Sequence, residues 1–173
     1  MSRSLGNLIA DSLQTSLGYA ERLLKNVPAD RFARFAAPGG VVVESNHPAF
    51  IYGHLSLYAP KILRQIGHPA PGVPDGFELA FSKDAKCVDD LDGDLYPKKD
   101  EIVNYFLEGH RMLTGALRST PDATFDQPNP AEGPMRDRFP TIGSVQAFYC
   151  GGHMMMHLGQ MSSWRRMERL GAA

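Results

Sequence analysis

Apolar residues recur every three or four positions in four separate stretches of this 173-residue chain, and this spacing restricts its fold more than any other feature. The spacing predicts helices over about residues 4–26, 45–67, 97–119 and 141–170. The short apolar run 41–43 has no convincing partner strand, so no sheet is expected. Each helix must bury one face, and four helices can do so by packing on one another. The sequence therefore predicts an all-α protein, a four-helix bundle.

Two of the connections between these helices are long. Residues 67–99 and 120–140 are rich in proline, glycine and charged residues, which is typical of irregular segments on a protein surface. The first contains a cluster of four aspartates, at positions 89, 90, 92 and 94, without the spacing of a calcium-binding loop, so we interpret the cluster as a solvated acidic loop. Pro60 interrupts the second helix and predicts a kink. The length suits one core, which predicts a single domain over residues 1–173.

The composition excludes several classes of function. Charged residues make up 21% of the chain and the formal net charge is −1, so no basic excess points to nucleic acid. No apolar run is long enough to cross a membrane, and the first 24 residues lack the pattern of a signal peptide. We therefore expect a cytoplasmic protein with no nucleic-acid or membrane partner. The two cysteines, Cys87 and Cys150, are too few for a disulfide framework, and Cys150 is expected in the core.

Two histidines in the last predicted helix share one face. His153 and His157 lie four residues apart in GGHMMMHLGQ, which places both imidazoles on the same side of a helix. That face also carries Val145, Met156 and Trp164, so it is expected to point into the core. Buried imidazoles need polar partners. Either each histidine forms hydrogen bonds with separate neighbours, or the pair shares a metal ion.

A third histidine favours the metal. His54 lies on the apolar face of the second predicted helix, and three histidines on inward faces of two helices are hard to explain by packing alone. His47 is predicted to be exposed or near the helix cap formed by Ser45 or Asn46, where it could line the mouth of a site. His68 in a loop and His110 at the core boundary are not expected to be ligands.

The residues around the histidines restrict the chemistry. The chain lacks the Glu-x-x-His pairs of di-iron bundles, so a single ion held by three histidines is the consistent site. Three imidazoles leave a zinc-like ion with an open position, which is the catalytic pattern. Met154 to Met156 fill the interval that holds a glutamate in HExxH peptidases, so peptidase chemistry is disfavoured. Tyr58 and Tyr149 can orient a ligand or pack as aromatic residues.

Two short segments resemble a known family. YGHLSLY on the second helix, followed by HMMMHLGQ on the last helix, is similar to the DinB-like (DinB/YfiT) superfamily of four-helix-bundle proteins. The resemblance implies that His54, His153 and His157 bind one divalent metal ion, zinc or nickel, with Gln160 just beyond these ligands. It also implies a homodimer. Some members of the superfamily use low-molecular-weight thiols as transferases or isomerases.

These observations leave several functions open. The first hypothesis is a metal-dependent enzyme, a small-thiol S-transferase that joins a low-molecular-weight thiol to a small electrophilic substrate. It requires a cavity that reaches the metal site, with polar or basic groups at its mouth. The alternatives are a metal-dependent hydrolase, a non-catalytic or stress-related bundle with a structural ion, and a polar histidine network without an ion. Whether the protein is an enzyme is not decided by the sequence.

Overall fold

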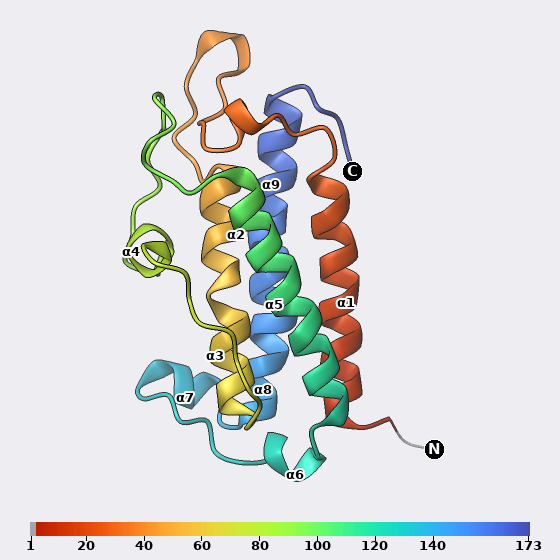
Figure 1. The fold of residues 1–173 in the computed structure, drawn as a ribbon. Helices are drawn as coiled ribbons and strands as arrows, with labels where there is room; N and C mark the ends of the chain where they lie inside the picture. Colours follow the sequence, from red (N-terminus) through yellow and green to blue (C-terminus); the bar gives the residue numbers. More distant parts are fainter. Residues whose placement is uncertain (1–2) are drawn as a thin grey trace.

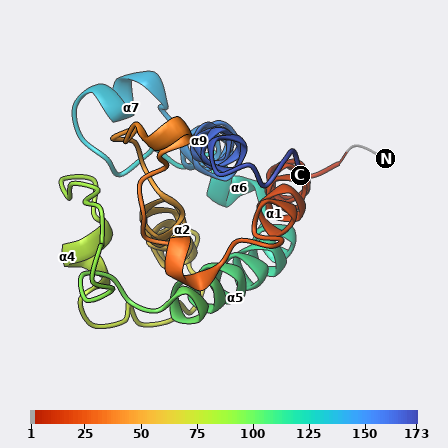
Figure 2. The same cartoon turned by 90° about the horizontal axis from the view of Figure 1, so that it is seen from above.

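Four long helical segments run alongside one another in the computed structural model, which describes residues 3–173 (Figure 1). Seen from above, they surround a common centre (Figure 2). Within the described residues there is no strand, only isolated bridges between Ala36 and Val43 and between Pro128 and Thr141. The four segments are α1 (Leu5–Leu23), α2 (Pro48–Ser56) continued by α3 (Tyr58–Gln65), α5 (Lys99–Ser119), and α8 (Ile142–Ala147) continued by η3 (Phe148–His153) and α9 (Met154–Met167). The predicted all-α bundle is confirmed.

Local signals set the ends and breaks of these helices. The hydroxyl of Thr141 accepts a hydrogen bond from the Ser144 N–H and caps α8 as predicted. The cap of α2 is His47, not Ser45 or Asn46 as predicted, and its Nδ1 accepts from the Phe50 N–H. The predicted interruption by Pro60 is also present, as the break between α2 and α3, because proline has no N–H to donate to the carbonyl four residues earlier.

The last helical segment differs from the continuous α-helix that its periodicity predicts. Residues Phe148–His153 form a π-helical segment, η3, between α8 and α9. Such segments are rare and frequently mark functional sites. Gly151 lies within it, and a Cβ at this position would be 2.9 Å from the Ser12 Oγ of α1. The glycine therefore lets η3 pack closely on α1, immediately before the first of the two histidines.

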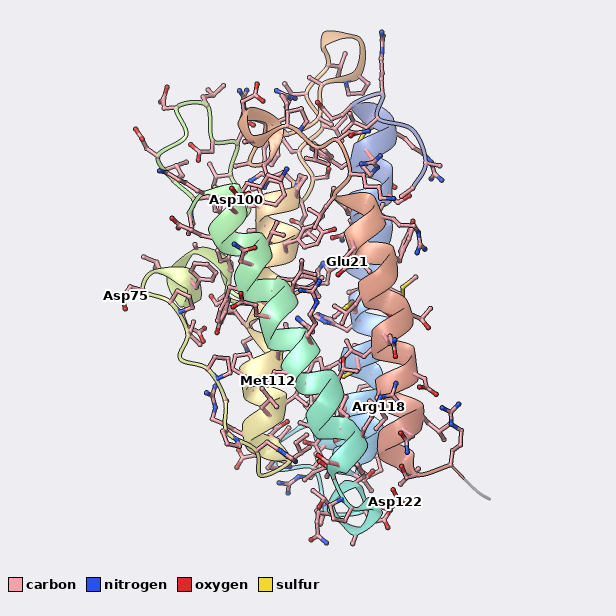
Figure 3. The ribbon with its side chains drawn as sticks, turned by 45° about the vertical axis from the view of Figure 1, so that its right-hand side comes forward. Glu21, Asp75, Asp100, Met112, Arg118 and Asp122 are labelled. Atoms are coloured by element: carbon pink, nitrogen blue, oxygen red, sulfur yellow. The ribbon has the colours of Figure 1, made fainter. Side chains whose placement is uncertain are left out.

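A dense core fills the space between the four segments. Its largest fully buried side chains include Trp164, Tyr52 and Phe106. The Tyr52 hydroxyl donates to the Ala20 carbonyl at 2.8 Å, so even the polar end of this side chain is paired. On the opposite side of the molecule from α4, Arg118 of α5 reaches α1, where it donates to Asp11 and Gln14 (Figure 3). None of the helices in the described part of the chain is long and apolar enough to cross a bilayer.

The connections carry short elements that the sequence did not predict. The 67–99 connection contains α4 (Phe77–Phe81), which lies beside α2 (Figures 1 and 2). The 120–140 connection contains α6 (Asp122–Phe125) and α7 (Pro134–Arg138), and residues 24–47 contain the short turns η1 (Ala29–Arg31) and η2 (Pro38–Gly40). Both connections are otherwise irregular, as predicted.

The acidic loop is only partly solvated. Asp90 is buried, and its carboxylate accepts hydrogen bonds from the backbone N–H groups of residues 93, 94, 95 and 96. Asp89 pairs with Arg34 at 2.9 Å, and this hydrogen bond holds the pKa of Asp89 below its usual value. Asp92 and Asp94 are exposed as predicted. The prediction of a solvated loop was wrong for Asp90, because its carboxylate organises the turn that follows it.

Candidate metal centre

The structure brings the three predicted site histidines together. One nitrogen from each of His54, His153 and His157 lies within 4.8 Å of the others. The ring centres are 4.9 Å apart for His54 and His157 and 4.8 Å apart for His153 and His157. All three side chains are buried, with exposed fractions of 7–8%. They are close enough to bind one metal ion, although their role as ligands stays a prediction.

His54 is anchored by a contact that depends on its neighbour in sequence. Its Nδ1 lies 2.9 Å from the carbonyl oxygen of Phe81, the last residue of α4. A Cβ at Gly53 would lie 2.5 Å from the Phe81 ring, so glycine is needed for Phe81 to come this close to α2. Because a carbonyl only accepts, Nδ1 carries the proton, and the lone pair of the neutral ring is on Nε2. This is the usual arrangement for a metal-binding histidine.

His157 is oriented in the same way by a side chain. Its Nδ1 lies 3.0 Å from the Oε1 of Gln160, and the same oxygen accepts from the Asn46 side-chain amide at 3.1 Å. An oxygen that accepts from Asn46 also accepts the Nδ1 proton of His157, which again places the ring's lone pair on Nε2. Gln160 therefore lies just beyond the three histidines, as the resemblance implies, and Asn46 connects it to the residues before α2.

His153 differs from the other two because part of its ring has no partner. Its Nδ1 is buried and forms no hydrogen bond with any described residue. A buried imidazole nitrogen without a partner is costly, so a hydrogen-bonded histidine network alone leaves the site incomplete. Two rings with directed Nε2 lone pairs and a third with an unpaired nitrogen form a donor set that fits one divalent ion.

The electrostatics keep these imidazoles neutral. Burial, and to a smaller extent the repulsion of like charges on His157 and His54, lowers the pKa of His153 to about 3. Burial also lowers the pKa values of His54 and His157. Within the described residues, the cluster includes no carboxylate that could stabilise a charged ring. Neutral imidazoles are the form that binds metal ions, so the site is ready for a cation at neutral pH.

An open cavity reaches His54 from the side of α4. Its volume is about 370 Å³, and His54, Tyr58 and Tyr149 are part of its lining. The Tyr58 hydroxyl lies 3.3 Å from His54 Nε2, and its ring centre is 4.8 Å from that of Tyr149. The predicted placement of both tyrosines at the site is confirmed. The three histidines are therefore buried, and His54 is the one that this cavity reaches.

Other residues differ from what their positions in the sequence predicted. His47 lies at the cap of α2, which is one of its two predicted placements, but it is fully buried, with Nε2 3.0 Å from the Val88 carbonyl, and lines neither of the two cavities beside α2. His110, predicted at the core boundary, is buried on α5 with Nδ1 2.7 Å from the Phe106 carbonyl. Met156 was assigned to the inward face and is 56% exposed, because η3 shifts the face that α9 turns inward. Cys150 is buried in the core as predicted.

Two groups at the site had no clear signal in the sequence. The Phe81 carbonyl comes from a short helix inside a predicted loop, and a backbone oxygen leaves no trace in residue type. Asn46 was interpreted as a helix cap, whereas its side chain pairs with Gln160. Gly53, just before His54, is a signal that could have indicated a close neighbour at this point of α2, because a Cβ there would lie 2.5 Å from the Phe81 ring.

A helical bundle with a three-histidine cluster between its second and fourth helical segments defines the class of this protein. The sequence profile of the DinB superfamily matches residues 12–161, a range that includes all three histidines. The chain belongs to the DinB superfamily. No curated protein and no solved structure matches it significantly.

Proposed function

We propose that this protein is a metal-dependent enzyme that transfers a small thiol to an electrophilic substrate, with His54, His153 and His157 holding one zinc or nickel ion. The observation that carries the proposal is the cavity of about 370 Å³ whose lining includes His54. A purely structural ion needs no such access, whereas a catalytic ion needs an open position that a substrate can reach.

In the proposed enzyme, different residues of this chain would orient the metal ligands, bind the substrate and exclude water. Phe81 and Gln160 bind the Nδ1 atoms of His54 and His157, which leaves the Nε2 atom of each ring to hold the ion. The Tyr58 hydroxyl lies 3.3 Å from His54 Nε2, and an ion on this nitrogen would free the hydroxyl to hydrogen-bond a ligand in the cavity. When bound, the ion would favour the thiolate form of a thiol, which is its nucleophilic form. The packed bundle behind the histidines excludes water from the other side.

A structural ion is the second candidate, and the position of the ligands favours it to some extent. His54 belongs to α2, whereas His153 and His157 belong to η3 and α9, so an ion would join the second and fourth helical segments. Hydrolase chemistry has less support, because the cluster within residues 3–173 includes no carboxylate to act as a base on water. A homodimer and a cytoplasmic location are supported only by the resemblance and the composition.

The proposal is tested with protein loaded with zinc or nickel, a small thiol, and 1-chloro-2,4-dinitrobenzene as the electrophile. In the expected reaction a carbon–sulfur bond forms, chloride leaves with the bonding electron pair, and the thiol proton goes to solvent. The product absorbs light, so its formation is followed directly. We expect a rate that depends on the metal and on His153 and His157. A loaded protein that is no faster than the His153→Ala/His157→Ala variant, with several thiols and electrophiles, would leave the structural ion as the better account.

A further inference from the structure

The charged residues that line the cavity come from two sides, α3 on one and α4 with the segment after it on the other. Lys61 and Arg64 lie one turn apart on α3, and both line the cavity. The other side carries Glu78 of α4 and Asp84 from the segment after it, with Lys83 between them in sequence. All five side chains are exposed. The cavity is therefore positive along α3 and of mixed charge, with two carboxylates, on the side of α4.

The basic side chains of this cavity form no ion pair within the described part of the protein. Among the described residues, none of Lys61, Arg64 and Lys83 lies within 4.0 Å of a carboxylate, although two carboxylates line the same cavity. The arginines on other surfaces behave differently, since Arg34 and Arg118 both form ion pairs. Lys61 extends instead over the ring of Tyr149, with its Nζ 5.8 Å from the ring centre. Its ammonium group thus lies beside Tyr149, whose ring centre is 5.6 Å from that of His153, and is available to a ligand.

We propose that this cavity is a subsite for a thiol of the amino-acid type, and this inference rests on the proposed function. The carboxylate of the ligand would lie against Lys61 and Arg64, and its ammonium group would lie against Glu78 and Asp84. Its sulfur would point toward His54, the site histidine that lines the cavity. The volume of about 370 Å³ is in the range that holds a small organic molecule.

The experiment uses four small thiols that share a two-carbon or similar spacing and differ in charge. L-cysteine carries both charges, 3-mercaptopropionate only the negative charge, cysteamine only the positive charge, and 2-mercaptoethanol neither. Each is titrated into protein loaded with Co²⁺, whose visible absorption changes with its ligands, so that binding is measured without turnover. The affinity of each thiol for the variant is compared with its affinity for the parent protein. Differences in pKa between the four thiols therefore do not affect the comparison.

Two double variants separate the two sides. In Lys61→Gln/Arg64→Gln, cysteine and mercaptopropionate should each bind about tenfold more weakly, since two exposed charge contacts are lost. In Glu78→Gln/Asp84→Asn, cysteine and cysteamine should weaken several-fold. Binding of 2-mercaptoethanol should not change in either variant. Matched controls are Lys25→Gln and Asp75→Asn, which alter exposed charges outside the cavity; Asp75 is visible at the edge of the molecule in Figure 3.

The outcomes distinguish this inference from the proposed function. If all four thiols change the Co²⁺ spectrum and neither double variant alters their affinities, the subsite is wrong and the proposed function stands. If only the Lys61→Gln/Arg64→Gln variant has an effect, the ligand is an anion, and the assignment of an amino-acid type is overturned. If no thiol changes the spectrum of protein that binds Co²⁺, both the proposed function and the subsite are overturned.

Discussion

Gly53→Ala tests how the site is built, because Gly53 controls the distance between α2 and Phe81. The new Cβ would lie 2.5 Å from three carbons of the Phe81 ring. That ring is fully buried and packs on Phe77 and Tyr96, with ring centres 5.3 Å and 5.7 Å away, so it has little room to move. Overpacking of this kind costs about 1–3 kcal/mol, and alanine in a helix recovers about 1 kcal/mol. We expect a net loss of about 0–2 kcal/mol in the free energy of unfolding.

The effect of Gly53→Ala on metal binding should be larger than its effect on stability. A displaced Phe81 takes its carbonyl away from His54 Nδ1, which removes the hydrogen bond that orients this ring. Loss of such a partner typically weakens metal binding by about 10- to 100-fold. The affinity is measured by competition for Zn²⁺ with a chromophoric chelator, and stability by urea unfolding of the metal-free protein.

Gly115→Ala is the matched control, since it makes the same change in a helix far from the site. Gly115 lies on α5, and a Cβ added there would have no atom within 4 Å, so alanine should stabilise the protein by about 1 kcal/mol and leave the Zn²⁺ affinity unchanged. If Gly53→Ala stabilised the protein equally and bound Zn²⁺ as tightly as the parent, the close approach of Phe81 would not hold His54, and the reasoning would be refuted.

Three further predictions follow from the same structure. Zn²⁺ at about 100 times its Kd should raise the free energy of unfolding of the parent protein by about 2.7 kcal/mol, which calorimetry should show as a rise of about 5–10 °C in Tm. The His153→Ala/His157→Ala variant should not be stabilised by Zn²⁺. Burial lowers the pKa of His110 from 6.5 to about 4, so the unfolded chain binds this proton at higher pH than the folded chain. Protonation of His110 in the unfolded chain should therefore by itself lower the free energy of unfolding of metal-free protein by about 2–4 kcal/mol between pH 6.5 and pH 4. His47 and the three site histidines add to this fall because burial lowers their pKa values too, so His110→Leu should reduce the slope in urea titrations without abolishing it. Asp90→Ala should cost about 1.5–3 kcal/mol in urea unfolding because four backbone N–H groups lose their acceptor, whereas Asp92→Ala should change stability by less than about 0.5 kcal/mol.

The parts of the fold that depend on periodicity could be predicted from the sequence. The bounds of α1 and α5 follow from apolar spacing, and the break before α3 follows from the missing N–H of Pro60. The inward direction of His54, His153 and His157 also follows, because each shares a face with large apolar residues. These predictions hold because helical spacing is a property of the local sequence.

The parts that depend on tertiary packing could not be predicted. The π-helical segment η3 changes the face of α9 by inserting a residue, and no pattern in FYCGGH distinguishes it from an α-helix that contains two glycines. His110 carries a polar ring and was placed at the boundary, whereas the Phe106 carbonyl satisfies it inside the core. The charges of Lys61 and Glu78 come together in one cavity only because α4 folds back beside α2.

The central claim is that three histidines of this bundle bind one metal ion, and elemental analysis tests it most directly. Tag-free protein is incubated with zinc and with nickel, freed of excess metal, and measured beside His153→Ala/His157→Ala and the control His68→Ala, whose histidine lies outside the cluster and contacts Thr120. The account predicts about one ion per chain in the parent and in His68→Ala, and none in the double variant. Parent protein that holds no ion after both incubations, in a folded bundle, would contradict it.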